Sequence, residues 1–296
     1  MELRVLRYYL MAAREENITR AAELLHVTQP TLSRQLMQLE EELGVKLFRR
    51  GGHSITLTDE GMLLKRRAQE LIALADKTKK ELLCDAEPLS GEIGIGCGEL
   101  LSMSELADIM AAFRRQYPLV QYNLFSSNSD GIKERIEHGT LDIGLLLEPV
   151  DIGRYAFVRM NSREEWGVLV REDSPLARLE SVSPNDLAGA PLYMTSRYAV
   201  RHEIDSWLGE CADYIDRTIS FNLLYNCAVV VQRSGGAAVC LRLNCSYDSL
   251  RFVPLSPRIE TGSVLAWKEH QTLSPAVSAF IRFAKQYISG ISQDLI

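Results

Sequence analysis

Apolar residues near the start of the chain recur every three or four positions, which is the period of an amphipathic helix. Leu3, Leu6 and Leu10 follow this spacing and predict a helix over residues 2–15. A second, shorter helix follows, and we expect the Thr19 side chain to cap its first turn. The first part of the chain is therefore expected to be helical.

A third predicted helix begins after Thr28 and ends at Gly44, a residue suited to the left-handed conformation of a helix end. Its leucines form one apolar stripe, and polar side chains occupy the opposite side. This arrangement is typical of a helix-turn-helix, whose third helix enters the major groove of DNA. The alternative is a helical subdomain whose polar face is only solvated. We expect DNA contacts from Gln29, Pro30, Thr31, Ser33, Arg34 and Gln38.

Two short apolar runs after Gly44 flank a glycine pair and predict a β-hairpin. Basic residues lie at its base, as in a wing that rests on the DNA backbone, where they supply the salt-dependent part of the affinity. Lys46 belongs to this set, and solvation is the alternative for the histidine at the tip. We expect contacts to DNA from Arg49, Arg50 and His53.

A long helix with a heptad-like apolar seam is predicted over residues 59–88, after a winged helix-turn-helix domain at 1–58. Such a seam requires a partner, and we interpret it as a dimerisation helix; packing on its own domain is the alternative. Pro88 and Gly91 then favour a linker. The seam consists of Leu64, Ala68, Leu71, Ala75, Thr78 and Leu82.

Strands and helices alternate through residues 89–296, which predicts a parallel α/β sheet in each of two lobes. We place lobe 1 at 92–162 and 268–296, and lobe 2 at 163–267. Expected strands are 91–97, 120–125, 141–147, 166–170, 192–195, 218–222, 237–241 and 264–267, and expected helices are 103–116, 131–138, 200–208, one ending at 233, and 275–287.

Ligands of open α/β sheets bind beyond the carboxyl ends of the strands. The loops expected there are rich in hydroxyl and amide groups, and helix N-termini offer free N–H groups. Arg197 is the evident partner for an anion and Glu148 for a cation; capping or solvation is the alternative for every residue of the set. We expect a small carboxylate or another polar metabolite to contact Leu101, Ser102, Ser104, Ser127, Asn128, Glu148, Thr195, Ser196, Arg197, Asn222 and Tyr225.

Composition restricts the partners. The formal net charge of −6, from 33 basic and 39 acidic residues, excludes an extended polybasic coat but permits a local DNA-reading face. The longest uncharged run, 218–232, falls short of the roughly 18 apolar residues of a membrane span. The N-terminus does not match a signal peptide, and we expect a cytoplasmic protein.

The six cysteines form no C-x-x-C pair, and no two histidines have ligand spacing, so we expect neither a metal nor a cofactor. Reduced thiols are the favoured interpretation. The alternative is a redox switch between two of Cys211, Cys227, Cys240 and Cys245. The chain lacks the nucleophile elbow, phosphate-binding loop and zinc-protease motifs, and we expect it not to be an enzyme.

Four segments of the N-terminal part of the chain resemble the LysR-type transcriptional regulators. They read NITRAAE at 17–23, VTQPTLSRQL at 27–36, LEEELGVKLFRR at 39–50 and LTDEG at 57–61. The resemblance implies a winged helix-turn-helix, a linker-helix dimer and a two-lobed effector domain like a type 2 periplasmic binding protein. The segment 101–105 lacks the proline common there in the family, which leaves the shape of that loop open.

The resemblance also implies partners. A regulator of this family binds an inverted repeat in promoter DNA as a homodimer or homotetramer, responds to a small-molecule effector, and is expected to contact RNA polymerase. Two other functions remain open from the sequence. One is a redox-responsive regulator on the same scaffold, and the other is a solute-binding module without a regulatory role.

Overall fold

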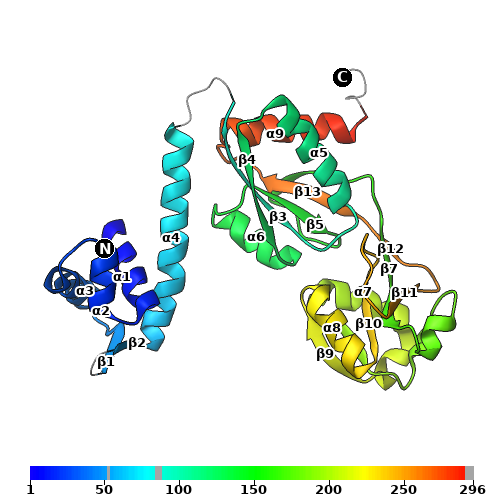
Figure 1. Cartoon of the computed structure of the whole chain (residues 1–296). Helices are drawn as coiled ribbons and strands as arrows, with labels where there is room; N and C mark the ends of the chain where they lie inside the picture. Colours follow the sequence, from blue (N-terminus) through cyan, green and yellow to red (C-terminus); the bar gives the residue numbers. More distant parts are fainter. Residues whose placement is uncertain (52–53, 84–88, 291–296) are drawn as a thin grey trace. The chain divides into compact units, whose positions relative to one another are not determined.

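The computed structural model describes residues 1–51, 54–83 and 89–290. The chain forms two compact units, Met1–Leu83 and Cys84–Ile296 (Figure 1). Each unit has its own apolar core. No helix within the described ranges is long and apolar enough to cross a membrane. His53 of the expected wing lies outside the described residues.

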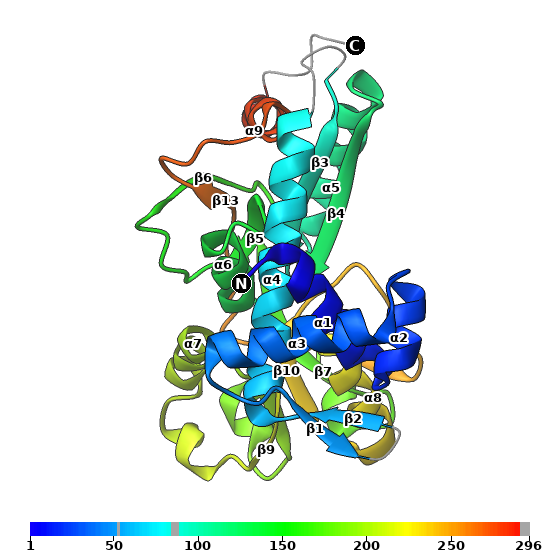
Figure 2. The same cartoon turned by 90° about the vertical axis from the view of Figure 1, so that its left-hand side faces the viewer.

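Unit 1 is a group of helices with a two-stranded hairpin at the end where the long helix begins (Figure 2). Leu32, Leu36 and Leu39 are buried against Leu6 and Tyr9, so most of the predicted apolar stripe of the third helix packs inward. Leu43, the last leucine of the predicted stripe, is exposed instead. The elements are α1 (Leu3–Glu15), α2 (Ile18–Leu24), α3 (Gln29–Leu43), β1 (Phe48–Gly51), β2 (Ser54–Leu57) and α4 (Asp59–Leu83).

The helix ends in unit 1 follow their capping side chains. Thr28 caps α3 and Gly44 ends it in the left-handed conformation, with φ of 70°, as predicted. The predicted cap of the second helix was wrong. Asn17 accepts a hydrogen bond from the Arg20 N–H at 3.0 Å, so α2 begins before Thr19 and includes it.

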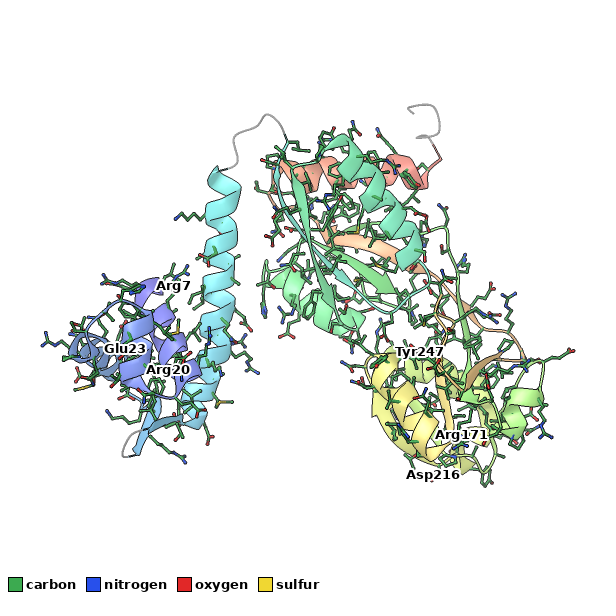
Figure 3. The ribbon with its side chains drawn as sticks, viewed as in Figure 1. Arg7, Arg20, Glu23, Arg171, Asp216 and Tyr247 are labelled. Atoms are coloured by element: carbon green, nitrogen blue, oxygen red, sulfur yellow. The ribbon has the colours of Figure 1, made fainter. Side chains whose placement is uncertain are left out.

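Helix α4 packs along α1, so part of the predicted apolar seam is buried in unit 1 and part is exposed. Ala68 is buried in unit 1, and Leu64 is partly buried there, so this part of the seam contacts its own domain. Arg7 on α1, labelled in Figure 3, forms an ion pair with Asp76 on α4 at 2.5 Å. The side chain of Leu71 is 41% exposed, so only part of the expected seam is open to a partner. The Leu82 side chain lies outside the described ones.

Lobe 1 of unit 2 is a five-stranded sheet in the order β4-β3-β5-β13-β6. Helices α5 and α9 cover one face and α6 the other (Figure 1). Its elements are β3 (Gly91–Cys97), α5 (Met103–Gln116), β4 (Val120–Ser126), α6 (Ser129–Glu137), β5 (Ile143–Leu147), β6 (Tyr155–Arg159), β13 (Ser263–Lys268) and α9 (Pro275–Ile288).

Lobe 2 is built on the sheet order β11-β7-β10-β8-β9, with β12 paired to β7. Helix α7 packs on one face and α8 on the other. Its elements are β7 (Glu164–Arg171), β8 (Leu192–Thr195), α7 (Tyr198–Leu208), β9 (Arg217–Phe221), α8 (Leu224–Ser234), β10 (Ala237–Leu241), β11 (Leu250–Pro254), β12 (Glu260–Thr261) and the 3₁₀ turns η1 (Pro175–Arg178), η2 (Pro184–Leu187) and η3 (Gly209–Tyr214).

Two expectations for unit 2 are corrected by strand β13. It pairs antiparallel with both β5 and β6, and β7 pairs antiparallel with β10 and β11, so the sheets are mixed rather than parallel. The range 163–267 was assigned to lobe 2, but β13 lies in the lobe 1 sheet. The chain returns from lobe 2 before this strand, and that reversal gives β13 its opposite direction.

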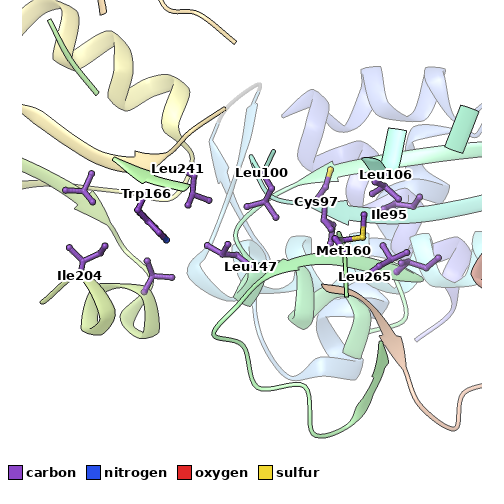
Figure 4. Close-up of a cluster of buried hydrophobic side chains, with 14 of the residues drawn as sticks. Ile95, Cys97, Leu100, Leu106, Leu147, Met160, Trp166, Ile204, Leu241 and Leu265 are labelled. Atoms are coloured by element: carbon purple, nitrogen blue, oxygen red, sulfur yellow. The ribbon is translucent and has the colours of Figure 1, made fainter. Parts of the chain in front are cut away.

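The two lobes share one apolar cluster where they meet. Leu100 and Leu147 of lobe 1 belong to the same buried group as Trp166 and Leu241 of lobe 2 (Figure 4). Because apolar side chains gain free energy when water is removed from them, this shared cluster favours contact between the lobes. The junction is therefore part of the core of unit 2.

Candidate functional site

Helix α3 presents the predicted polar face to solvent. Gln29, Pro30, Thr31, Arg34 and Gln38 are exposed, and Ser33 is half-buried. The hydroxyl groups of Thr31 and Thr28 lie 2.8 Å apart, and the Gln38 side chain accepts a hydrogen bond from Gln35 at 3.1 Å. The Arg34 side chain has no hydrogen bond or ion pair with any described residue of the chain. Its guanidinium is therefore available to a ligand.

The hairpin brings basic residues beside α3, but these residues differ in whether they are already bound to another side chain. Arg49 is exposed on β1, opposite Thr56. The Lys46 ammonium donates to Glu40 on α3 at 2.9 Å and is partly committed to that contact. The Arg50 side chain lies outside the described ones, as does His53. Arg34 and Arg49 thus remain as the described cations of the predicted DNA-contact set.

A cavity of about 90 Å³ lies between the lobes of unit 2. At roughly 15 Å³ for each water-sized group, it has room for about six such groups. Polar side chains from both lobes line it, including five that the sequence singled out: Ser127, Asn128, Thr195, Arg197 and Asn222. The rest of the wall is largely apolar and was missed from the sequence: Leu100, Leu147, Trp166, Val200, Phe221, Leu223, Leu224, Val239, Leu241 and Leu243.

Arg197 crosses from lobe 2 to lobe 1 beside this cavity. It is 6% exposed, and its guanidinium donates to the carbonyl oxygens of Leu147, at 2.8 Å, and of Pro149. Its Nε atom lies 3.7 Å from the Asp130 carboxylate. Burial lowers the pKa of Arg197, and the carboxylates of Asp130 and Glu203 oppose this shift. The predicted anion partner therefore already connects the lobes.

Glu99 forms a second connection in the opposite direction. This residue follows β3 in lobe 1, lines the cavity, and accepts a hydrogen bond from the N–H of Leu224, the first residue of α8 in lobe 2. The first N–H groups of a helix have no partner within it and attract carboxylates. Sequence patterns gave no sign of this contact, because an isolated glutamate in a loop resembles a solvated charge.

The remaining residues of the predicted ligand set lie outside the cavity lining. The backbone N–H groups of Leu101 and Ser102 donate to the buried carboxylate of Glu164. Glu148 lies in a separate hollow with Glu203 and pairs with Arg159 at 3.5 Å. Three side chains of the set are exposed: Ser104, Ser196 and Tyr225.

The thiols near the cavity are buried. Cys240 lines the wall, and burial raises its pKa; burial also raises the pKa of Cys227 to about 12. Protonated thiols are poor nucleophiles, so burial disfavours thiolate chemistry at these two positions. Within the described residues, no group of three or more His, Cys, Asp and Glu side chains is arranged to hold a metal ion.

Two family models match this chain. The model described as a LysR substrate binding domain matches residues 86–289. The model described as a bacterial regulatory helix-turn-helix protein of the lysR family matches residues 3–62. The division between the two compact units, after Leu83, lies in the stretch 63–85 that separates the two matches.

Individual relatives agree with these matches. The HTH-type transcriptional regulator YybE of Bacillus subtilis is 30% identical, over 97% of this chain and 98% of its own. The HTH-type transcriptional activator IlvY of Salmonella typhimurium is 30% identical over 70% of each chain. The crystal structure of full-length CbnR with its target DNA has a TM-score of 0.75 at 19% identity, covering 97% of this chain and 100% of that one, which shows the fold alone. The family models and the full-length relative show that the chain belongs to the LysR family and is a DNA-binding transcriptional regulator with an effector-binding domain.

Proposed function

We propose that this regulator reads promoter DNA with helix α3 and that a small molecule in the interlobe cavity controls it. The observation that carries the proposal is the pairing of an exposed polar face on α3, which includes Arg34, with a separate cavity lined by both lobes of unit 2. One surface suits a nucleic acid and the other suits a metabolite, so input and output reside on different units.

The DNA contacts follow from the chemistry of the exposed groups. Arg34 projects from the middle of α3, where a guanidinium can donate to a guanine edge, and Gln29 and Gln38 offer amides to bases. Arg49 on the hairpin neutralises a phosphate, as expected for Arg50 and His53. Exposed leucines on α4 pair two subunits, so that two α3 helices address the halves of an inverted repeat.

The effector is a small molecule with a polar end and an apolar body. The hydroxyl and amide groups of Ser127, Asn128 and Thr195 suit a carboxylate or another polar group, and the leucine-rich wall suits a hydrocarbon part. Because the ligand touches both lobes, it binds one lobe arrangement better than another. That difference in affinity is what shifts the population of lobe arrangements.

The redox-responsive alternative has less support. Its candidate thiols include Cys227 and Cys240, whose burial keeps them protonated at neutral pH. The solute-binding alternative assigns no role to the exposed polar face of α3. Control by a bound metabolite uses both features.

The test of the proposal is genome-wide DNA occupancy of the full-length protein, measured with and without candidate nutrients. We expect discrete promoter peaks whose occupancy or footprint changes with one nutrient class. Arg34→Ala should weaken binding to the isolated site by about 1–3 kcal/mol, or roughly 5–150-fold, if Arg34 reads a base.

Arg282→Ala is the matched control, because it removes the same charge from the exposed face of α9 in unit 2. It should leave DNA affinity unchanged. Absence of peaks for folded, expressed protein under all conditions would overturn the regulator function, and equal binding by Arg34→Ala would remove Arg34 from the reading face.

A further inference from the structure

We propose that Glu164 is a built-in carboxylate that occupies the turn at the start of α5 and closes this helix end to an anionic effector. The inference rests on the proposed function, because it narrows where the effector's polar group binds. It also explains why Leu101, Ser102 and Ser104, which the sequence favoured as ligand contacts, lie outside the cavity lining.

The geometry of this helix end is that of an occupied anion site. Oε2 of Glu164 accepts from the Leu101 N–H at 2.7 Å, and Oε1 accepts from the Ser102 N–H at 3.0 Å. The Ser102 hydroxyl accepts from the Ser263 hydroxyl at 2.8 Å. Glu164 has no exposed surface. Donors that elsewhere bind a ligand's carboxylate are therefore used within this chain.

A buried carboxylate of this kind needs compensation, because leaving water penalises its charge. The two backbone N–H groups and the positive end of the 14-residue helix α5 supply it. An effector anion entering this turn would have to displace Glu164 and leave that carboxylate buried without partners. The exchange is unfavourable, so Glu164 excludes competing anions.

Glu164 also ties α5 to the crossover between the lobes. It is the first residue of β7, and Glu105 on α5 accepts from the N–H groups of Asn161 at 3.0 Å and Ser162 at 3.2 Å. Helix α5 thus binds the crossover through the Glu105 carboxylate, and the crossover binds the start of α5 through the Glu164 carboxylate. The polar end of the effector is therefore directed to the other polar groups of the cavity lining, Ser127, Asn128 and Thr195.

Chemical rescue tests this assignment directly. Glu164→Ala removes Cγ and the carboxyl group, which together correspond to one acetate ion. We expect the full-length variant to melt at a lower temperature than the wild type and to regain about 2–4 °C in tens of millimolar sodium acetate, relative to sodium chloride at equal ionic strength. The wild type should show no difference between the two salts.

Two variants serve as controls. Glu164→Gln fills the same space with a neutral amide, so it should lose stability without gaining any from acetate. Glu105→Ala removes a half-buried carboxylate from the same helix, whose partners are open to water, and should show no acetate-specific rise. If Glu164→Ala is recovered unfolded, its refolding yield in acetate and in chloride gives the same comparison.

An acetate response equal in the wild type and the variant, or no response in Glu164→Ala by melting and by refolding, would overturn the inference. Promoter binding by the wild type is measured separately and needs no acetate. The two experiments can therefore fail independently. If the protein does not bind promoters, acetate can still rescue Glu164→Ala. If acetate does not rescue Glu164→Ala, the wild type can still bind promoters.

Discussion

At the scale of single residues, one glutamate positions the hairpin against helix α3. Glu40 on α3 accepts hydrogen bonds from the N–H groups of Leu47, at 2.8 Å, and Phe48, at 3.2 Å, and from the Lys46 ammonium. Burial favours the neutral acid, yet these donors dominate and lower the pKa of Glu40 below its ordinary value. The charged carboxylate is therefore the form that holds the start of the hairpin.

We predict that Glu40→Gln costs unit 1 about 1–3 kcal/mol of local stability, because a charge-assisted acceptor is lost. Faster hydrogen exchange at the Leu47 and Phe48 amides is the measurement. Since the folded pKa is lowered, the stabilisation is present above the ordinary carboxyl pKa and is lost as pH falls through the folded pKa. Glu40→Gln should remove this acid dependence. Glu41→Gln, an exposed neighbour, should behave like the wild type; equal protection in Glu40→Gln would contradict the role.

The same scale shows what sequence can reveal about a site. The exposed face of α3 followed from helical periodicity, because that pattern is local. Glu40, Glu99 and Glu164 were missed, since the chain alone does not show which carboxylate folds against a distant backbone N–H. Arg197 was expected at the ligand site, but its donation to lobe 1 carbonyls depends on packing between lobes.

At the scale of elements, α4 carries two apolar faces with different roles. One face packs on α1 through Ala68. The other leaves Leu63, Leu71 and Leu74 exposed along one side of the helix, at 54%, 41% and 39%. An uncovered apolar stripe on a long helix is typical of a helix that pairs with another copy.

We predict that Leu71→Glu with Leu74→Glu weakens self-association of the full chain by at least about tenfold, because charge repels across such a pairing. Sedimentation over a range of concentrations is the measurement. Met62→Glu is the control: Met62 is also an exposed apolar residue of α4, but it lies about 100° around the helix from Leu63. An unchanged association constant in the double variant would place the subunit contact elsewhere.

At the scale of the whole effector unit, two contacts of opposite direction join the lobes beside the cavity. Arg197 of lobe 2 reaches the Leu147 carbonyl, and Glu99 of lobe 1 reaches the Leu224 N–H. If both contacts break together when the lobes separate, loss of either contact makes the other break more often. The N–H of Leu224 is a sensitive reporter, because it has no partner within α8.

We therefore predict that Arg197→Ala accelerates hydrogen exchange at the Leu224 amide severalfold, although the two residues do not share a hydrogen bond. Glu99→Ala should accelerate it further, since the acceptor itself is lost. Asp205→Ala breaks the Arg217 ion pair, which lies within lobe 2, and should leave this amide unchanged. An unchanged exchange rate of the Leu224 amide in Arg197→Ala would show that the two contacts open independently.

Most strands and helices of this unit could be predicted, because buried strands read as apolar runs between turn residues. The structure has four predicted elements at the expected bounds: β3, α5, β8 and β10. Strands β6 and β11 were missed, since each lies at the edge of a sheet and mixes buried with exposed positions. The lobe assignment of β13 failed because sequence order does not reveal when a chain returns to an earlier sheet.

The return of the chain through β13 has an evolutionary consequence. Lobe 2 leaves lobe 1 at Glu164 and comes back at Thr261, and these two residues are direct partners in the β7–β12 pair. A segment whose two ends meet in one antiparallel pair is topologically an insertion, and insertions at adjacent ends are well tolerated. Recombination at this point exchanges all of lobe 2, and with it the lobe 2 side of the cavity, while lobe 1 and unit 1 stay unaltered. New effector specificities in such a protein are therefore reachable by swapping a cassette as well as by changing single residues.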